Sequence, residues 1–162
     1  MTRLCPEQPD DRDLIRHIHL ASFPSPAEAE LVDQLREAND GIISLLAEEA
    51  GQAVGHVLLS RMRAPFSALG LGPVAVLPDW RRRGIAARLI ETGLAQAVNA
   101  GWDAVFVLGD PAYYGRFGFR AVEAASFQSP YAGAYFMVHA LKGRLPVHEG
   151  RVDYPPAFAR LG

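Results

Sequence analysis

A run of three arginines followed by a glycine is the part of this sequence with the clearest chemical meaning. Arg81, Arg82 and Arg83 precede Gly84, and an amphipathic helical pattern starts at Ile85. The first backbone N–H groups of a helix have no partner within the helix, and together with the helix dipole they attract anions. Glycine lets the backbone approach such an anion closely, and the arginines add positive charge. The segment therefore predicts a loop that binds a phosphate or pyrophosphate.

The spacing of this loop does not by itself identify the ligand. The pattern Arg81-x-x-Gly84-x-Ala86 lacks the three glycines of the dinucleotide fingerprint and the Gly-Lys-Ser/Thr ending of the P-loop. Three adjacent arginines on a solvated surface turn are the alternative interpretation of the same residues. The neighbouring segments have to decide between the two.

A second block supplies that context. The segment Tyr114-Gly115-Arg116-Phe117-Gly118-Phe119 follows the arginine loop, with an apolar run at 104–108 between them. In this order, the two blocks resemble the GCN5-related N-acetyltransferase (GNAT) family, in which Gln/Arg-x-x-Gly-x-Gly/Ala at a helix start binds acetyl-CoA. Gly55-His56-Val57 and the residues from Leu108 to Tyr114 resemble small bacterial members of that family. The resemblance covers roughly residues 3 to 141 and leaves 142–162 outside it.

The resemblance implies that acetyl-CoA is bound as the acetyl donor, without a metal. The strand before the loop is expected to splay away from its neighbour, so that the backbone of Val74 and Val76 can hydrogen-bond the pantetheine arm. The expected CoA-binding residues are Val74, Ala75, Val76, Arg81, Arg82, Arg83, Gly84, Ile85 and Ala86.

The resemblance also implies direct attack of a neutral amine on the thioester. Tyr114 is expected to protonate the leaving thiolate; a packed core tyrosine, or a catalytic role for Tyr113 instead, are the alternatives. His56 is a candidate base that acts directly or through water, or else a packed strand histidine. Glu28 and Glu30 are candidates for recognition of a cationic acceptor, although a favourable charge at a helix N-terminus explains Glu28 as well.

Two histidines and the single cysteine are the remaining candidates for reactive groups, and they predict no further site. His17 and His19 stand two apart on a predicted helix and face different directions, so we expect no metal site and place both at the surface or at a helix cap. Cys5 is the only cysteine, which excludes an internal disulfide and favours a reducing compartment such as the cytoplasm.

Length and composition indicate the number of domains and exclude some classes of ligand. The 162 residues are 49% hydrophobic and carry a formal net charge of −2, which predicts one domain over 1–162 without the basic field that nucleic acid requires. No apolar run approaches the ~18 residues of a membrane span. We therefore expect a cytoplasmic N-acetyltransferase with a small-molecule or protein amine as acceptor, in a family where homodimers are common. The rival functions are a non-catalytic acyl-CoA sensor and a nucleotide-binding or RNA-modifying partner domain.

The elements that position these residues follow from the hydrophobic periodicity. A first helix is capped by Asp10 or Asp11 and ends near Phe23, a second follows a capping box of Ser25 and Glu28, and a third runs from the arginine loop to near Gly101. Asp110 is expected to cap a short helix that contains the two tyrosines. Strands are predicted at 42–48, 53–62, 71–77, 104–108, 119–122 and 135–141, with a loop at 63–70 and no element beyond Pro146. The predicted fold is a mixed α/β sheet of six or seven strands with helices on both faces, antiparallel at the start and parallel where the third helix crosses over.

Overall fold

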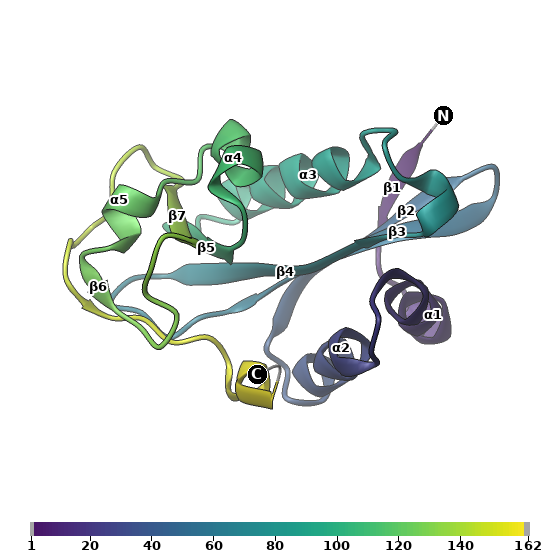
Figure 1. The fold of residues 1–162 in the computed structure, drawn as a ribbon, viewed down its shortest axis with the longest axis horizontal. Coiled ribbons are helices and arrows are strands. Elements are labelled where there is room, and N and C mark those ends of the chain that lie inside the picture. The colour runs from purple at the N-terminus through teal and green to yellow at the C-terminus, as the bar shows by residue number, and fades with distance from the viewer. Residues whose placement is uncertain (1, 161–162) are drawn as a thin grey trace.

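The computed structural model describes residues 2–160, which form a mixed sheet with helices on both faces (Figure 1). Six strands follow the order β1-β2-β3-β4-β5-β7. All neighbours in this sheet are antiparallel except β4 and β5, which are parallel. The strands are β1 (Arg3–Pro6), β2 (Gly41–Glu49), β3 (Gln52–Arg61), β4 (Ala68–Val76), β5 (Ala104–Leu108) and β7 (Phe136–Ala140). The predicted fold class, with its hairpin and its parallel crossover, is confirmed.

Helices α1 (Arg12–Ser22) and α2 (Ala27–Glu37) lie on one side of the sheet, and α3 (Ile85–Asn99) lies on the other (Figure 1). The α3 helix packs against β2, β3 and β4. Its buried residues repeat at intervals of three and four, as expected for one helix face; they are Ile85, Leu89, Ile90, Gly93, Leu94 and Ala97. This packing fixes the start of α3, and with it the arginine loop, against the end of β4.

The central strand β4 separates from β5 partway along its length. It pairs with β3 as far as Val76, but its pairing with β5 runs only from Ala68 to Leu71. From Gly72 onward, β4 therefore has a partner strand on one edge alone among the described residues. The splayed strand that the family resemblance implied is present, and the start of α3 lies beside it (Figure 1).

The start of β4 differs from the prediction. The strand begins at Ala68 and not at Leu71, so the predicted loop at 63–70 is wrong in its last three residues. Ser67 anchors this end, because its carbonyl accepts hydrogen bonds from the N–H groups of Asp103 and Ala104 at 3.1 and 3.2 Å. Residues 68–70, in a stretch without clear periodicity, are buried here and pair with the parallel strand β5.

Two further predictions fail after the short tyrosine helix. The strand expected at 119–122 is wrong: Arg120 makes an isolated bridge to Val138, and the chain then turns into the short helix α5 (Ala121–Ala124), which buries Ala124. The expectation of no element beyond Pro146 is also wrong. There, β8 (Gly150–Arg151) pairs in parallel with β6 (Phe127–Gln128), and the 3₁₀ helix η4 (Pro156–Arg160) packs against α2. Two-residue strands are too short to show a periodicity.

The predicted helix caps have mixed outcomes. The short helix α4 (Pro111–Tyr114) is capped as expected, because the Asp110 carboxylate accepts the N–H of Ala112 at 2.9 Å. Asp11 does precede α1, but its carboxylate accepts from the Gln8 N–H and caps the preceding 3₁₀ turn η1 (Pro9–Asp11). The α2 helix starts after Pro26, and the reciprocal capping box of Ser25 and Glu28 is wrong. Ser25 still accepts the N–H of Ala27 on its Oγ at 3.3 Å, so the serine contacts the helix start without Glu28.

Candidate functional site

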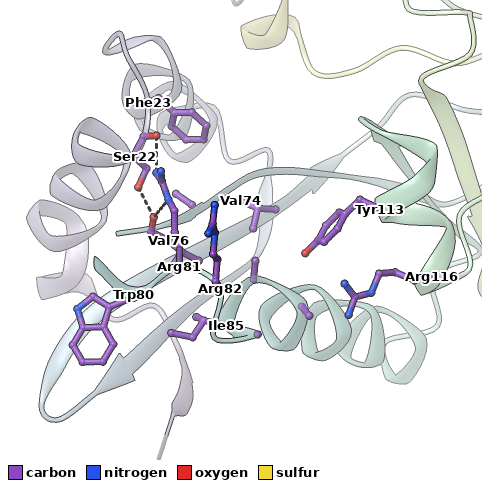
Figure 2. Close-up of a pocket in the computed structure, with 14 residues that line it drawn as sticks. Ser22, Phe23, Val74, Val76, Trp80, Arg81, Arg82, Ile85, Tyr113 and Arg116 are labelled. Carbon is purple, nitrogen blue, oxygen red and sulfur yellow. Dashed lines mark hydrogen bonds between the residues drawn. The ribbon is translucent and has the colours of Figure 1, made fainter. Parts of the chain in front are cut away.

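The arginine loop borders a cavity of about 390 Å³, here called the Arg82 cavity. It lies between the splayed half of β4, the start of α3 and the segment that contains α4 (Figure 2). Its lining residues are Ser22, Phe23, Val74, Ala75, Val76, Trp80, Arg81, Arg82, Gly84, Ile85, Ala86, Ala87, Tyr113 and Arg116. Eight of the nine predicted CoA-binding residues line it, and Arg83 does not.

The loop combines two residues of left-handed backbone with the start of a helix. Arg82 and Gly84 both have left-handed backbone angles, with φ of 64° and 78°. At the start of α3, the N–H of Arg88 donates to the carbonyl of Gly84 at 3.1 Å. The N–H groups of Ile85, Ala86 and Ala87 precede this hydrogen bond in the first turn of the helix. Such N–H groups at a helix start attract anions. A Cβ on Gly84 would meet no atom within 4 Å, so the backbone there borders open space.

The three arginines of the loop lie in three different environments. Arg81 donates from Nε to the carbonyl of Val76 and from Nη2 to that of Ser22, both at 3.0 Å, and thereby ties α1 to the end of β4 (Figure 2). Arg82 is exposed and lines the cavity. Arg83 instead stacks 4.8 Å above the Trp80 ring and lies outside the cavity lining. Arg82 is thus the member of the run best placed to meet a bound anion.

The opposite wall of the Arg82 cavity comes from the tyrosine block. Tyr113 and Arg116 lie across the cavity from Arg81 and Arg82, with the Tyr113 hydroxyl facing the space between them (Figure 2). The Arg116 guanidinium lies 5.4 Å from the Tyr113 ring centre. Arg116 was not among the predicted site residues. Its position three residues after Tyr113 is the spacing that places two side chains on one helix face, and this signal could have identified it.

The splayed edge of β4 leaves backbone groups free to meet a ligand. The N–H of Leu77 donates to Val54 of β3 at 2.8 Å, and alternation along a strand therefore turns the polar groups of Val76 and Val74 to the other edge. The carbonyl of Val76 already accepts from Arg81 and from the Ser22 hydroxyl. The N–H of Val76 and both polar groups of Val74 remain directed toward the gap.

A second cavity, of about 320 Å³, adjoins the first and is here called the Tyr114 cavity. Its lining is mostly apolar and aromatic, and consists of Phe23, Glu28, Leu31, Leu71, Gly72, Pro73, Val74, Leu108, Tyr114, Tyr131, Tyr154 and Phe158. Phe23 and Val74 line both cavities, so the two meet at these residues. The adjacent tyrosines are thus divided between the cavities, with Tyr113 in the first and Tyr114 in the second.

The surroundings of Tyr114 keep its hydroxyl protonated. Burial, followed by the neighbouring Tyr113, raises the pKa of Tyr114 above its ordinary value of 10.0. The ring packs perpendicular to Phe119, with 6.0 Å between the ring centres. A phenol in this state is a proton donor throughout the neutral pH range.

The two candidate acceptor-binding glutamates lie differently. Glu28 lines the Tyr114 cavity, and its Oε1 is buried without a hydrogen-bond partner among the described residues. Glu30, two residues later on α2, is exposed and lines neither cavity. The structure therefore brings Glu28 and Tyr114 into one cavity and leaves Glu30 outside it.

His56 lies away from both cavities, in the packed environment that was the alternative interpretation. It is fully buried, with Nδ1 at 2.8 Å from His19 Nε2 and Nε2 at 2.8 Å from Ser44 Oγ. Ser44 donates its proton to Glu7, so its oxygen must accept from His56. His56 is then protonated on Nε2 and accepts on Nδ1 from His19. The expectation that His19 lies at the surface or at a cap is wrong, because this side chain is completely buried.

Burial keeps this histidine pair uncharged. Desolvation lowers the pKa of His19 from 6.5 to about 4, and that of His56 falls well below 6.5 for the same reason. The Nδ1 of His19 has no hydrogen-bond partner among the described residues. Within residues 2–160, no group of three or more His, Cys, Asp or Glu side chains could hold a metal ion. None of the helices described is long and apolar enough to cross a membrane.

Comparisons with known proteins agree with this architecture. A family model described as "Acetyltransferase (GNAT) family" matches residues 12–119. The chain is 36% identical over 164 residues to the "Uncharacterized N-acetyltransferase YhbS" of Escherichia coli (strain K12), an alignment that covers 96% of this chain and 97% of the relative.

Two solved structures are also similar over nearly the whole chain. The crystal structure of YhbS from Escherichia coli in complex with CoA has a TM-score of 0.92 and 34% identity, and the match covers 99% of this chain and 93% of that one. A GNAT family acetyltransferase from Brucella melitensis in complex with acetyl-CoA has a TM-score of 0.83 and 37% identity, with 98% of each chain covered.

Proposed function

The chain belongs to the acetyltransferase (GNAT) family and is an N-acetyltransferase. We propose that it transfers the acetyl group from acetyl-CoA, bound in the Arg82 cavity, to an amine bound in the Tyr114 cavity. One observation carries this proposal: the Arg82 and Tyr114 cavities meet at Phe23 and Val74. One cavity has the features that bind a phosphorylated donor. The other contains a protonated phenol and a carboxylate. Their meeting point is where an acyl group would pass from donor to acceptor.

We assign the CoA pyrophosphate to the loop at the start of α3. The N–H groups that precede the first helical hydrogen bond would bind its oxygens, and Arg82 would contribute charge. Arg81 acts mainly through position, because it holds the loop against Ser22 and Val76. The pantetheine arm would lie along β4 and hydrogen-bond Val74 as well as the N–H of Val76. Arg83 lies outside this assignment.

The reaction on these residues is a direct transfer. The amine nitrogen forms a C–N bond to the thioester carbonyl carbon, the C–S bond breaks, and Tyr114 donates its phenolic proton to the CoA sulfur. An amine that binds as a cation loses one proton to solvent before the attack, and its nitrogen loses a second proton after the attack. Tyr114 regains its own proton from solvent, so that an amide, free CoA and one released proton result. A positioned acid of this kind assists because negative charge develops on the sulfur only as the bond breaks.

The acceptor amine is assigned to the Tyr114 cavity, with Glu28 as its charged contact. Glu28 is supported by its place in the lining and by its unpartnered oxygen, whereas nothing in the placement of Glu30 supports a similar role. His56 is not assigned a role as base, since it is fully buried and lines neither cavity. We further propose that 1–162 form one domain, because Tyr154 and Phe158 of the C-terminal segment line the same cavity as Tyr114.

A non-catalytic acyl-CoA sensor is not favoured, because the relatives of this chain are N-acetyltransferases and because Tyr114 faces an adjoining cavity. The test has two parts. Calorimetry measures CoA binding, and mass spectrometry measures the acetylation of an amine panel by the same preparation. Binding with turnover supports the proposal; binding without turnover of any amine supports the sensor; and absence of CoA binding contradicts the donor site.

A further inference from the structure

The C-terminal segment that lies outside the family motifs forms one wall of the Tyr114 cavity, to which the acceptor is assigned. Tyr154 and Phe158 line it, and their ring centres are 4.8 Å apart. Tyr131 lies perpendicular to Tyr154 at 5.3 Å and donates its hydroxyl proton to the carbonyl of Phe158 at 3.4 Å. Three aromatic rings thus stand together on one side of the cavity.

This aromatic wall is held firmly against the sheet. Arg63 and Asp153 exchange backbone hydrogen bonds at 2.9 Å in both directions, immediately before Tyr154. The ring of Tyr154 occupies space that is free only because residue 70 is a glycine: a Cβ on Gly70 would lie 2.7 Å from its Cε1. Tyr154 is only 8% exposed. The segment is therefore an integral part of the cavity and not a loose extension beside it.

The cavity has few polar side chains, and two of them carry a buried atom without a hydrogen-bond partner among the described residues. Among the described lining residues, Glu28 carries the only charge. Glu28 Oε1 and the Tyr154 hydroxyl are both buried without a hydrogen-bond partner in the described part of the chain. Buried polar atoms nearly always have a partner, because leaving one unpaired costs free energy. Two such atoms in the lining of one cavity point to a ligand that supplies the missing hydrogen bonds.

Resting on the function proposed above, we infer that the acceptor is a small primary amine attached to an aromatic or branched apolar group, with no carboxylate of its own. The Glu28 carboxylate selects the positively charged amine, and the wall of Tyr131, Tyr154 and Phe158 holds the apolar body. Aromatic faces also attract cations directly. A carboxylate on the ligand would be repelled by the carboxylate of Glu28 and would find no cation among the described lining residues.

The size and polarity of the cavity exclude other acceptor classes. A volume of about 320 Å³ is at the lower end of the range for small-molecule sites. A polyamine would place several charges and little apolar surface against a lining with one carboxylate. A flexible protein terminus would bring several backbone amide groups against a lining that offers few polar side chains to pair with them.

The test compares the acetylation of four amines by the full-length protein with acetyl-CoA: 2-phenylethylamine, phenylalanine, spermidine and a short peptide with a free N-terminus. Phenylalanine differs from 2-phenylethylamine by one carboxylate, so this pair isolates the charge of Glu28. We expect kcat/KM for 2-phenylethylamine to exceed that for each of the other three by about 10-fold or more, the effect of roughly one charged hydrogen bond. An equal or higher value for any of them overturns the inference.

Variants then test the residues themselves. Glu28→Gln should raise KM for 2-phenylethylamine by about 10-fold or more and narrow the discrimination against phenylalanine, while Glu30→Gln on the same helix should leave both unchanged. Phe158→Leu should raise KM for 2-phenylethylamine without affecting CoA affinity, and Val147→Ala is the matched control in the exposed part of the same segment. Unchanged KM in both Glu28→Gln and Phe158→Leu would overturn the inference.

The same experiments separate this inference from the function on which it rests. CoA binding by calorimetry reports on the Arg82 cavity alone and shows that each variant is folded. A wild-type protein that binds CoA but acetylates no aromatic or branched alkyl amine overturns the acceptor class and leaves the donor site intact. A wild-type protein that fails to bind CoA contradicts the proposed function itself.

Discussion

The ring of Tyr114 packs directly against the backbone of Gly109. A Cβ on Gly109 would lie 2.3 Å from Cε2 of Tyr114, closer than any real contact allows. The glycine that follows β5 therefore makes room for the proposed catalytic phenol and sets the position of its ring. Because the obstruction would be a rigid aromatic ring, a side chain at position 109 must move either the ring or the backbone.

Gly109→Ala should therefore displace Tyr114 and lower turnover by about 10-fold or more, since small misplacements of a reacting group are costly. CoA affinity should change little, because Gly109 does not line the Arg82 cavity. Gly115→Ala is the control: a Cβ there meets nothing within 4 Å, and the backbone is already helical. Steady-state kinetics of both variants check this prediction, and equal kcat values would contradict it.

Removing the phenolic proton should separate the two adjacent tyrosines. Tyr114→Phe keeps the ring and deletes the donor, so turnover should fall by about 10²-fold while Tm and CoA affinity stay close to the wild type. Tyr113→Phe lies in the other cavity and should act mainly on KM for acetyl-CoA. If Tyr113→Phe loses turnover and Tyr114→Phe retains it, the catalytic assignment belongs to Tyr113.

Two glycines that flank α3 allow backbone strain to be separated from ligand binding. Gly84 and Gly101 both have positive φ, 78° and 86°, and both have open space where a Cβ would stand. Alanine at either position should cost about 1 kcal/mol of stability through strain. Only Gly84→Ala should also weaken CoA binding, because its methyl group would point into the space that we assign to the pyrophosphate. Denaturant unfolding and calorimetry on both variants measure the two effects; equal CoA affinity would reject the proposed loop.

The neighbouring arginines should differ although both are exposed. Arg82→Gln should weaken CoA binding by about 3- to 10-fold and reduce its dependence on salt, as expected when a surface charge that meets a phosphate is removed. Arg83→Gln should bind CoA like the wild type, because Arg83 stacks on Trp80 outside the cavity. Titrations at two ionic strengths test this, and a larger loss in Arg83→Gln would show that the loop faces the other way.

The buried histidine pair should make the fold sensitive to mild acid. His19 has a pKa of about 4 in the folded state and an ordinary value of 6.5. A basic group whose pKa is lowered on folding favours the folded state above its unfolded pKa, and this contribution is lost as the pH falls through the folded pKa. We therefore expect stability to fall between pH 6.5 and 4, by on the order of 3 kcal/mol for His19.

His19→Gln retains an N–H donor for His56 Nδ1 but does not titrate, so its loss of stability over this pH range should be smaller than that of the wild type. His17→Gln, at an exposed position on the same helix, is the control and should follow the wild type. Urea unfolding at several pH values measures the difference. Parallel stability profiles for all three proteins would show that His19 does not carry the effect.

Local patterns of the sequence were sufficient for the parts of the site that lie within one segment. The arginine loop, the glycine at the start of α3, the buried face of that helix and the Asp110 cap are all determined by residues within a few positions of one another. They depend on interactions between neighbouring backbone and side-chain groups, and these can be predicted from the order of the residues.

The tertiary structure decided what depends on residues far apart in the chain. The family resemblance favoured Tyr114 over Tyr113, but helical periodicity alone does not separate them. Adjacent positions on a helix point about 100° apart, and only the packing of α4 determines which tyrosine lines which cavity. His19 and His56 are paired across 37 positions. Tyr154 reaches the Tyr114 cavity from a segment without clear periodicity, because Gly70 on β4 leaves space for its ring. Such contacts form only when the whole sheet is assembled, and no local pattern specifies them.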